Sequence, residues 1–230
     1  MEDLSTAILS RQPHIVGAVG DHRVLDATIA QADCDLIELR LDALGCGAEV
    51  QQFAERLKAS HPIVLTARHP DEGGANELSA AERASALAAL LPHGALIDVE
   101  LQSLSDLADT WAGAGEHGLL RIASWHDFTG CPTVDELLAK LAAMHEAGAD
   151  IAKFAFRLDD PADIQAVVGI LRADSPLPLA VMGMGPLAPA SRLLAAQLGS
   201  VLNYGYLGSE PTAPGQWSAR LLKEAVNQSK

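Results

Sequence analysis

Short apolar runs alternate with amphipathic segments from one end of the chain to the other. The runs have the length and the content of Val, Ile and Leu that are typical of buried β-strands. Eight of them occur, at residues 14–19, 35–42, 62–68, 95–101, 119–128, 150–156, 177–184 and 201–207. Each is followed by a segment with helical apolar spacing, at 24–32, 50–60, 79–91, 105–115, 133–148, 161–173, 189–199 and 214–226. This alternation predicts an α/β fold with a parallel sheet.

Eight strand-helix units within 230 residues predict a (β/α)8 barrel that forms one domain over residues 1–230. Local signals agree, since Thr133 and Asp160 are typical helix N-caps and Gly148 follows a helix end. No linker, composition break or internal repeat marks a second domain. The alternative is an open doubly wound sheet, which requires a glycine-rich turn after the first strand. Only GAVGDHRV, at 17–24, is a weak candidate for such a turn.

The alternation of side chains within the strands sends polar groups into the predicted barrel. In the strand at 35–42, Ile37, Leu39 and Leu41 occupy the face that packs on helices, so the other face points inward. For Glu38, Arg40 and Arg68 a buried ion-pair network is the alternative, but it does not explain an accompanying histidine and lysine. The inward polar positions of five consecutive strands are Glu38, Arg40, Asp42, Thr66, Arg68, Asp98, Glu100, Ser124, His126 and Lys153.

Lys153 lies in the middle of an apolar strand, DIAKFAF, on the same face as Ile151 and Ala155. The alternative is a lysine that reaches water from a strand end, because lysine is seldom fully buried. Inside a barrel, burial and neighbouring cations disfavour the ammonium and favour a nucleophilic amine. A neutral amine forms an imine with a ketone, and the imine acidifies the adjacent carbon. His126 on the neighbouring strand suits the proton transfer that follows, which indicates a Schiff-base lyase or aldolase.

Other catalytic chemistries lack a matching motif. The eight histidines include no H-E-x-x-H or other spaced ligand set, so we expect no metal and no other cofactor. Ser124 and Ser191 are not part of a G-x-S-x-G elbow. The glycines of the GMGP stretch are typical of a tight turn between a strand and a helix, although barrels often bind phosphate near their last two loops.

The net charge of −14 opposes binding to nucleic acid and to anionic membranes. An anionic small molecule must therefore be held by locally placed arginine or lysine. No apolar run approaches the ~20 residues of a membrane helix. The first residues, MEDLSTAILSRQPH, lack the apolar core of a signal peptide, and Cys34, Cys46 and Cys131 form no C-x-x-C pair. These features predict a cytoplasmic protein with neither membrane nor nucleic-acid partners.

Six motifs occur in an order that points to one family. They are IELRLD, TARHPDEGG, SWHDF, DIAKFAF, VMGMGPLAPASR and GSEPTAPGQ. In these motifs and their spacing, the chain resembles the type I 3-dehydroquinate dehydratases of the shikimate pathway over nearly its whole length. The resemblance implies a (β/α)8 barrel, a homodimer, and the conversion of 3-dehydroquinate to 3-dehydroshikimate in the biosynthesis of aromatic amino acids.

The resemblance also implies the catalytic residues. Lys153 matches the lysine that forms an imine with the C3 ketone of 3-dehydroquinate. His126 matches the general acid and base that removes a C2 proton and then protonates the departing C1 hydroxyl. Glu72 matches the carboxylate that orients this histidine, whereas without the motif an exposed loop acid would be the simpler interpretation.

The remaining motif positions match substrate contacts. By resemblance, Glu38 and Arg40 contact the ring hydroxyls, and Arg68 makes a further substrate contact. Arg192 matches the arginine that binds the substrate carboxylate, for which a planar guanidinium is well suited. Thr212 and Gln216 match the loop that covers the bound substrate.

Two positions depart from the family pattern, and two other functions stay open. Thr212 stands where the family usually has serine, and Ala18 aligns where some members have a hydroxyl group; both changes concern affinity. A class I aldolase that acts on a sugar phosphate shares the lysine and the fold. A non-catalytic barrel that binds a metabolite is the third possibility.

Overall fold

The computed structural model describes residues 6, 12–26, 33–209, 211–213 and 215–229, and it contains one eight-stranded parallel sheet. Consecutive strands pair from β1 to β7, and the first strand also pairs with the last. This order defines a (β/α)8 barrel and confirms the predicted fold. The strands are β1 (His14–Val19), β2 (Leu36–Arg40), β3 (Ile63–Thr66), β4 (Leu96–Glu100), β5 (Leu120–Asp127), β6 (Ile151–Arg157), β7 (Leu179–Met184) and β8 (Leu202–Tyr206).

The barrel closes between β7 and β8 through a mixture of backbone and side-chain contacts. The Val201 amide donates to the Leu179 carbonyl oxygen at 2.8 Å. The Val181 amide donates to the Ser200 hydroxyl oxygen at 3.0 Å, so a buried side chain takes the place of a backbone acceptor. Closure leaves no exposed sheet edge at this seam, and the alternative open sheet is therefore wrong.

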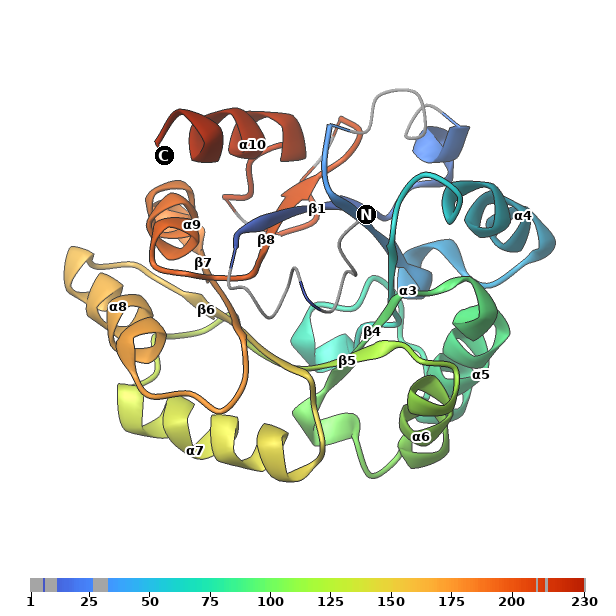
Figure 1. Cartoon of the computed structure of the whole chain (residues 1–230), viewed down its shortest axis with the longest axis horizontal. Helices are drawn as coiled ribbons and strands as arrows, with labels where there is room; N and C mark the ends of the chain where they lie inside the picture. The colour runs from blue at the N-terminus through green and yellow to red at the C-terminus, as the bar shows by residue number, and fades with distance from the viewer. Residues whose placement is uncertain (1–5, 7–11, 27–32, 210, 214, 230) are drawn as a thin grey trace.

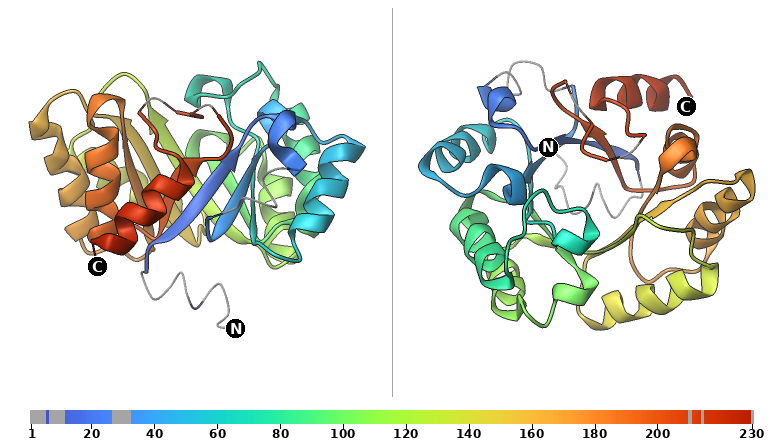
Figure 2. Two further views of the ribbon diagram at one scale, coloured as in Figure 1. Left: turned by 90° about the horizontal axis from the view of Figure 1, so that it is seen from above. Right: turned by 180° about the vertical axis from the view of Figure 1, so that it is seen from behind.

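Helices surround the strands as a ring (Figure 1). Seen from the side in Figure 2, the strands are inclined to the barrel axis, as closure of a parallel sheet requires. The helices are α3 (Leu41–Leu44), α4 (Ala48–Leu57), α5 (Ala80–Leu90), α6 (Ala108–Glu116), α7 (Val134–Glu146), α8 (Ile164–Arg172), α9 (Ala188–Gln197) and α10 (Ala219–Gln228). Short 3-10 helices are η1 (His22–Val24), η2 (Pro70–Glu72), η3 (Leu91–His93), η4 (Leu101–Ser103), η5 (Pro161–Asp163) and η6 (Gly185–Leu187). In the described part of the chain, no helix has the length and apolar character that crossing a membrane requires.

Two apolar layers build the core. The larger layer lies between the strands and the surrounding helices and includes Ile37, Leu39 and Phe154. The smaller layer fills the barrel interior near the strand starts. Because this floor is apolar, polar inward residues are confined to the carboxyl ends of the strands, where barrel enzymes bind their substrates. The floor includes Val16, Leu36, Val64, Leu96, Ile122 and Ile151.

Several element boundaries follow the predicted signals, whereas one predicted strand and one predicted helix differ from the structure. Thr133 forms a capping box with Glu136 at the start of α7, and Gly148, with a φ of 75°, follows its end. The predicted strand at 35–42 ends early, because Asp42 lies in α3 and its carboxylate accepts backbone N–H groups from the loop after β3. The last helix starts at Ala219, five residues later than predicted from the pattern at 214–226. The predicted helix at 24–32 falls mainly on residues outside the described part of the chain.

Candidate active site

A narrow pocket of about 50 Å³ opens at the carboxyl ends of the barrel strands. It brings together all nine residues predicted to form the site, from six of the eight βα units. A wider groove of about 510 Å³ runs outside the barrel beside Trp125 and Lys140, but it contains none of these nine residues. The nine residues that line the inner pocket are Glu38, Arg40, Arg68, Glu72, His126, Lys153, Arg192, Thr212 and Gln216.

Lys153 is buried in this pocket, with only 3% of its surface exposed. Its Nζ donates a hydrogen bond to Asp98 Oδ2 at 2.7 Å and lies 4.1 Å from the centre of the Tyr204 ring. Burial lowers the pKa of Lys153 and Arg68 lowers it further, while Asp98 opposes both effects. The lowered pKa agrees with an inward, buried lysine, and the pairing with Asp98 is a contact that the sequence did not predict. The interpretation of Lys153 as a lysine that reaches water is wrong.

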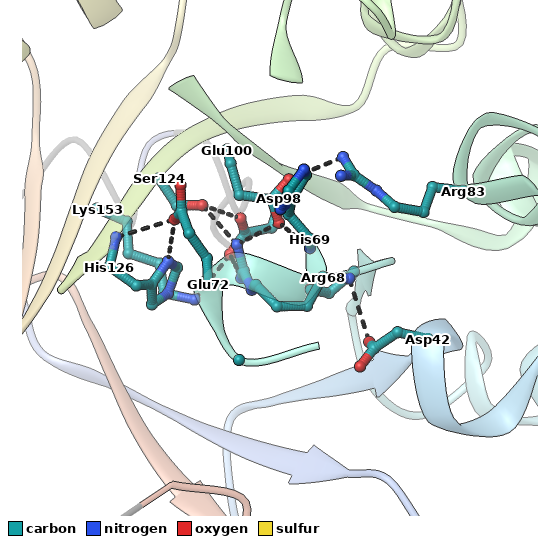
Figure 3. Close-up of polar contacts among 12 residues, drawn as sticks. Asp42, Arg68, His69, Glu72, Arg83, Asp98, Glu100, Ser124, His126 and Lys153 are labelled. Atoms are coloured by element: carbon teal, nitrogen blue, oxygen red, sulfur yellow. Dashed lines mark hydrogen bonds and ion pairs between the residues drawn. The ribbon is translucent and has the colours of Figure 1, made fainter. Parts of the chain in front are cut away.

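Asp98 is the centre of the charged network beneath the pocket (Figure 3). Besides Lys153, it accepts hydrogen bonds from Arg68 Nη2 at 2.9 Å and from the Ser124 hydroxyl at 2.6 Å. Burial raises the pKa of Asp98, but the charges of Arg68 and Lys153 outweigh it and hold that pKa well below its usual range. The Asp98 carboxylate is therefore ionised and fixes the position of the lysine amine.

Arg68 lines the pocket, but its guanidinium is engaged by residues of the charged network. Its Nη1 donates to Glu100 Oε1 at 2.8 Å and to the Ser124 hydroxyl oxygen at 2.7 Å, and Arg83 pairs with the other Glu100 oxygen at 2.9 Å. Arg68 is therefore part of a buried ion-pair network, which was the alternative to a direct substrate contact. Strand alternation placed Asp98, Glu100 and Ser124 inside the barrel, but no sequence motif assigned them a function.

His126 and Glu72 form a close pair at the pocket wall. The His126 Nδ1 lies 2.8 Å from Glu72 Oε2, and the His126 backbone amide donates to the same oxygen at 2.9 Å. Burial raises the pKa of Glu72 to about 7. Burial also lowers the pKa of His126, and the charges of Arg68 and Lys153 lower it further. The imidazole is therefore neutral near pH 7; with a proton on Nδ1 that is donated to Glu72, its Nε2 is free to act as a base.

The loop after β3 buries the Glu72 carboxylate. Pro70 begins the short helix η2, and Gly73 ends it with a φ of 87° that favours glycine. The Gly73 carbonyl accepts a hydrogen bond from Arg40 Nη2 at 2.9 Å, which ties the loop to the end of β2. Glu72 is 5% exposed, so the alternative of an exposed loop acid is wrong.

Gln102 holds the second oxygen of Glu72, with its Nε2 at 2.8 Å from Oε1, and no sequence signal indicated this contact. The contact favours the ionised carboxylate, so the pKa of Glu72, which is about 7, should rise further in Gln102→Ala. Because a protonated Glu72 no longer accepts a hydrogen bond from the histidine, we expect the acid limb of kcat/KM to move to higher pH. On that limb kcat/KM falls about two- to twelvefold, the value of one hydrogen bond.

The measurement is a pH profile of kcat/KM for Gln102→Ala beside Gln165→Ala, which changes an exposed glutamine of α8. Only the first variant should shift the acid limb. A parallel loss of activity at every pH would contradict the role assigned to Gln102.

Arg192 differs from the other arginines of the pocket. Arg40 pairs with Asp42, and Arg68 pairs with Asp98 and Glu100. Arg192 is 2% exposed, and its Nη1 donates to the Tyr204 backbone oxygen at 2.7 Å. Within the described ranges it has no carboxylate partner, and its Nε has no hydrogen-bond partner. Burial alone lowers its pKa to about 10, so the pocket contains a cation without a counter-ion.

The other predicted substrate contacts line the same pocket. Glu38 accepts a hydrogen bond from the Thr66 hydroxyl at 2.8 Å. In the last loop, the Thr212 amide and hydroxyl both donate to Gln216 Oε1, at 2.9 and 2.8 Å. The Thr212–Gln216 contacts fix the conformation of this loop, which lines the pocket, while the roles of its residues in substrate binding stay predictions.

The fold and the pocket are those of a (β/α)8-barrel enzyme. Residues 16–230 match the model of the type I 3-dehydroquinase family. The 3-dehydroquinate dehydratase of Methanothrix thermoacetophila is 33% identical over 225 residues, which cover 94% of this chain and 92% of the relative. That of Aromatoleum aromaticum is 36% identical over 210 residues, which cover 84% and 79%. The crystal structure of 3-dehydroquinate dehydratase from Geobacillus kaustophilus HTA426 has a TM-score of 0.84 at 28% identity and covers 94% of this chain and 91% of its own. The chain belongs to the type I 3-dehydroquinase family, which confirms the resemblance inferred from its motifs.

Proposed function

We propose that this chain dehydrates 3-dehydroquinate to 3-dehydroshikimate through an imine on Lys153. The observation that carries this proposal is the combination of two buried cations in one pocket. Lys153 has a lowered pKa that favours nucleophilic attack, and Arg192 has no counter-ion among the described residues. A ligand with both a ketone and a carboxylate satisfies these two groups together. Membership of the family supports 3-dehydroquinate as that ligand.

The reaction begins with attack of the Lys153 amine on the C3 ketone. The carbinolamine loses its oxygen as water, and the nitrogen becomes an imine. Asp98 stays ionised beside this nitrogen, so it stabilises the protonated imine electrostatically. The protonated imine withdraws electrons from the ring and acidifies the protons on C2.

His126 then carries the proton transfer. Its Nε2 removes a proton from C2, and the electron pair of the C–H bond moves into the imine to give an enamine. The histidine returns this proton to the C1 hydroxyl, which leaves as water while a C1–C2 double bond forms. Glu72 stabilises the charged imidazole between the two steps through its contact with Nδ1. Hydrolysis of the conjugated imine releases the product and restores the amine.

The remaining pocket residues orient the substrate in this proposal. Arg192 binds the carboxylate through the guanidinium donors that the protein leaves unsatisfied. Glu38 and Arg40 bind ring hydroxyls, and Arg68 acts chiefly by fixing Asp98. Thr212 and Gln216 cover the substrate and exclude water from the imine.

A sugar-phosphate aldolase is the competing function with the same lysine chemistry. A buried guanidinium without a counter-ion suits a carboxylate, whereas barrel phosphate sites rely on backbone N–H groups of the last loops. A non-catalytic barrel would not require a lysine with a lowered pKa next to a neutral histidine. The pocket therefore favours the dehydratase over both alternatives.

An ultraviolet assay tests the proposed function directly. The product contains a conjugated enone carboxylate that absorbs, and the substrate does not, so 3-dehydroquinate should give a steady rise in absorbance. Cyclic hydroxy acids that resemble quinate should inhibit the reaction, whereas sugar phosphates should not. The absence of any rise, or a preference for the phosphates, would overturn the proposal.

A further inference from the structure

Tyr204 lines the pocket and carries a buried hydroxyl group that no group of the described residues binds. Its side chain lies inside the barrel on β8, is 3% exposed, and lines the same pocket as Lys153 and Arg192. Its ring centre lies 4.1 Å from Lys153 Nζ. The hydroxyl oxygen is buried, and over the described ranges it has no hydrogen-bond partner. Each buried polar group of this kind requires an explanation.

Packing explains the ring of Tyr204 but not its hydroxyl. The ring belongs to the apolar layer inside the barrel, which also includes Met182 and Ala155, and its face lies against Lys153 Nζ, where it favours a positive charge. Phenylalanine would provide the same apolar contacts and the same ring face. A buried hydroxyl without a partner disfavours folding relative to phenylalanine. The presence of the hydroxyl therefore indicates a partner that arrives with a ligand.

The missing partner is a hydrogen-bond acceptor. Burial raises the pKa of Tyr204 well above its ordinary value, and the charges of Glu38 and Asp98 raise it further, so the phenol keeps its proton. The carboxylate of Asp98 is already occupied by Lys153, Arg68 and Ser124. Since the ring lies against Lys153 Nζ, the acceptor belongs to an atom of the ligand close to the carbon that the amine attacks.

We propose that Tyr204 is a further substrate-binding residue, whose hydroxyl donates a hydrogen bond to a ring oxygen of the substrate near the imine carbon. The ligand class is a hydroxylated cyclic keto acid, and the contact selects against deoxy analogues, because these leave the phenol unpaired. This inference rests on the proposed function, which supplies the imine and the carboxylate contact. The Tyr204 hydroxyl would be an additional hydrogen-bond donor to an oxygen of the substrate ring.

The substitution that tests it is Tyr204→Phe, which removes the hydroxyl and keeps the ring. We expect kcat/KM to fall about two- to twelvefold, as for the loss of one hydrogen bond. The melting temperature without ligand should stay the same or rise, because an unsatisfied buried group is removed. The matched control is Tyr206→Phe, two residues along the same strand and outside the pocket lining, which should leave kcat/KM unchanged.

Competitive inhibition by quinate-like acids identifies the oxygen that is contacted. For a quinate-like acid that keeps all its ring hydroxyls, the inhibition constant should be higher in Tyr204→Phe than in wild type, by the same factor as the decrease in kcat/KM. For the deoxy analogue that lacks the contacted oxygen, wild type and variant should bind equally, as in a double-mutant cycle.

The outcomes separate this proposal from the function on which it rests. Normal turnover in wild type with unchanged kinetics in Tyr204→Phe would overturn the contact and leave the dehydratase standing. A lower melting temperature with unchanged kinetics would show a purely structural hydroxyl and would also overturn it. No turnover of 3-dehydroquinate by wild type would overturn both proposals together.

Discussion

Lys153→Met should eliminate both dehydration of 3-dehydroquinate and the covalent adduct that borohydride traps. Methionine has a similar length and fills the space of the lysine stem. Without an imine the C2 proton is not acidified, so kcat should fall by more than about 10⁴-fold, beyond the loss of an acid-base catalyst. Mass spectrometry of wild type treated with substrate and borohydride should locate the reduced adduct on Lys153.

The control for this experiment is Lys58→Ala, which removes an exposed lysine just after α4. It should keep the adduct and the rate of wild type. The Asp98 carboxylate still accepts from Arg68 and Ser124 in Lys153→Met, so the variant should fold. If dehydration continued in wild type while no adduct formed under trapping conditions, the imine mechanism would be wrong.

His126→Ala should separate imine formation from proton transfer. The lysine amine and its Asp98 contact are unchanged, so borohydride should still trap an adduct on Lys153. Loss of the general base should lower kcat by about 10²–10⁴-fold. The adduct should also accumulate in the unreduced state, which mass spectrometry without borohydride can detect, because the steps after imine formation are slow.

His117→Ala is the matched control, since this exposed histidine directly follows α6 and is remote from the pocket lining. It should retain the wild-type rate. Loss of the trapped adduct in His126→Ala would assign the histidine to imine formation, and an unchanged kcat would remove it from the mechanism altogether.

Strand alternation was sufficient to place the charged residues inside the barrel. The side-chain period of two fixes the inward face of a strand, so Lys153 and His126 could be located from sequence. Their partners could not, because the neighbours of an inward side chain depend on the stagger between strands. The contact between Lys153 and Asp98 joins strands that are not adjacent, and only the closed barrel shows it.

Two further features of the site could not be predicted from the sequence: the path of the loop that carries Glu72, and the hydrogen-bond donors that lack an acceptor. Glu72 reaches His126 because η2 and Gly73 turn the loop back over the barrel, a path that alternation does not describe. The unsatisfied groups of Arg192 and Tyr204 are properties of the packed state, since a sequence does not show which donors lack acceptors. Asp42 was misplaced because the apolar pattern continues from β2 into α3 without a break.

The seam where β8 meets β1 and β7 also governs when during folding the site becomes complete. The β1–β8 part of the seam joins residues near opposite ends of the chain, so these contacts have a high sequence separation and a large loop-closure entropy. Arg68, Asp98 and Lys153 belong to the first six strand-helix units, whereas Arg192 and Tyr204 arrive with the last two. A chain that has folded only those six units would contain the amine of Lys153 but would lack the guanidinium of Arg192 in its place. The proposed carboxylate contact therefore requires ring closure, and we expect it to be completed only when the last two units have packed against the first.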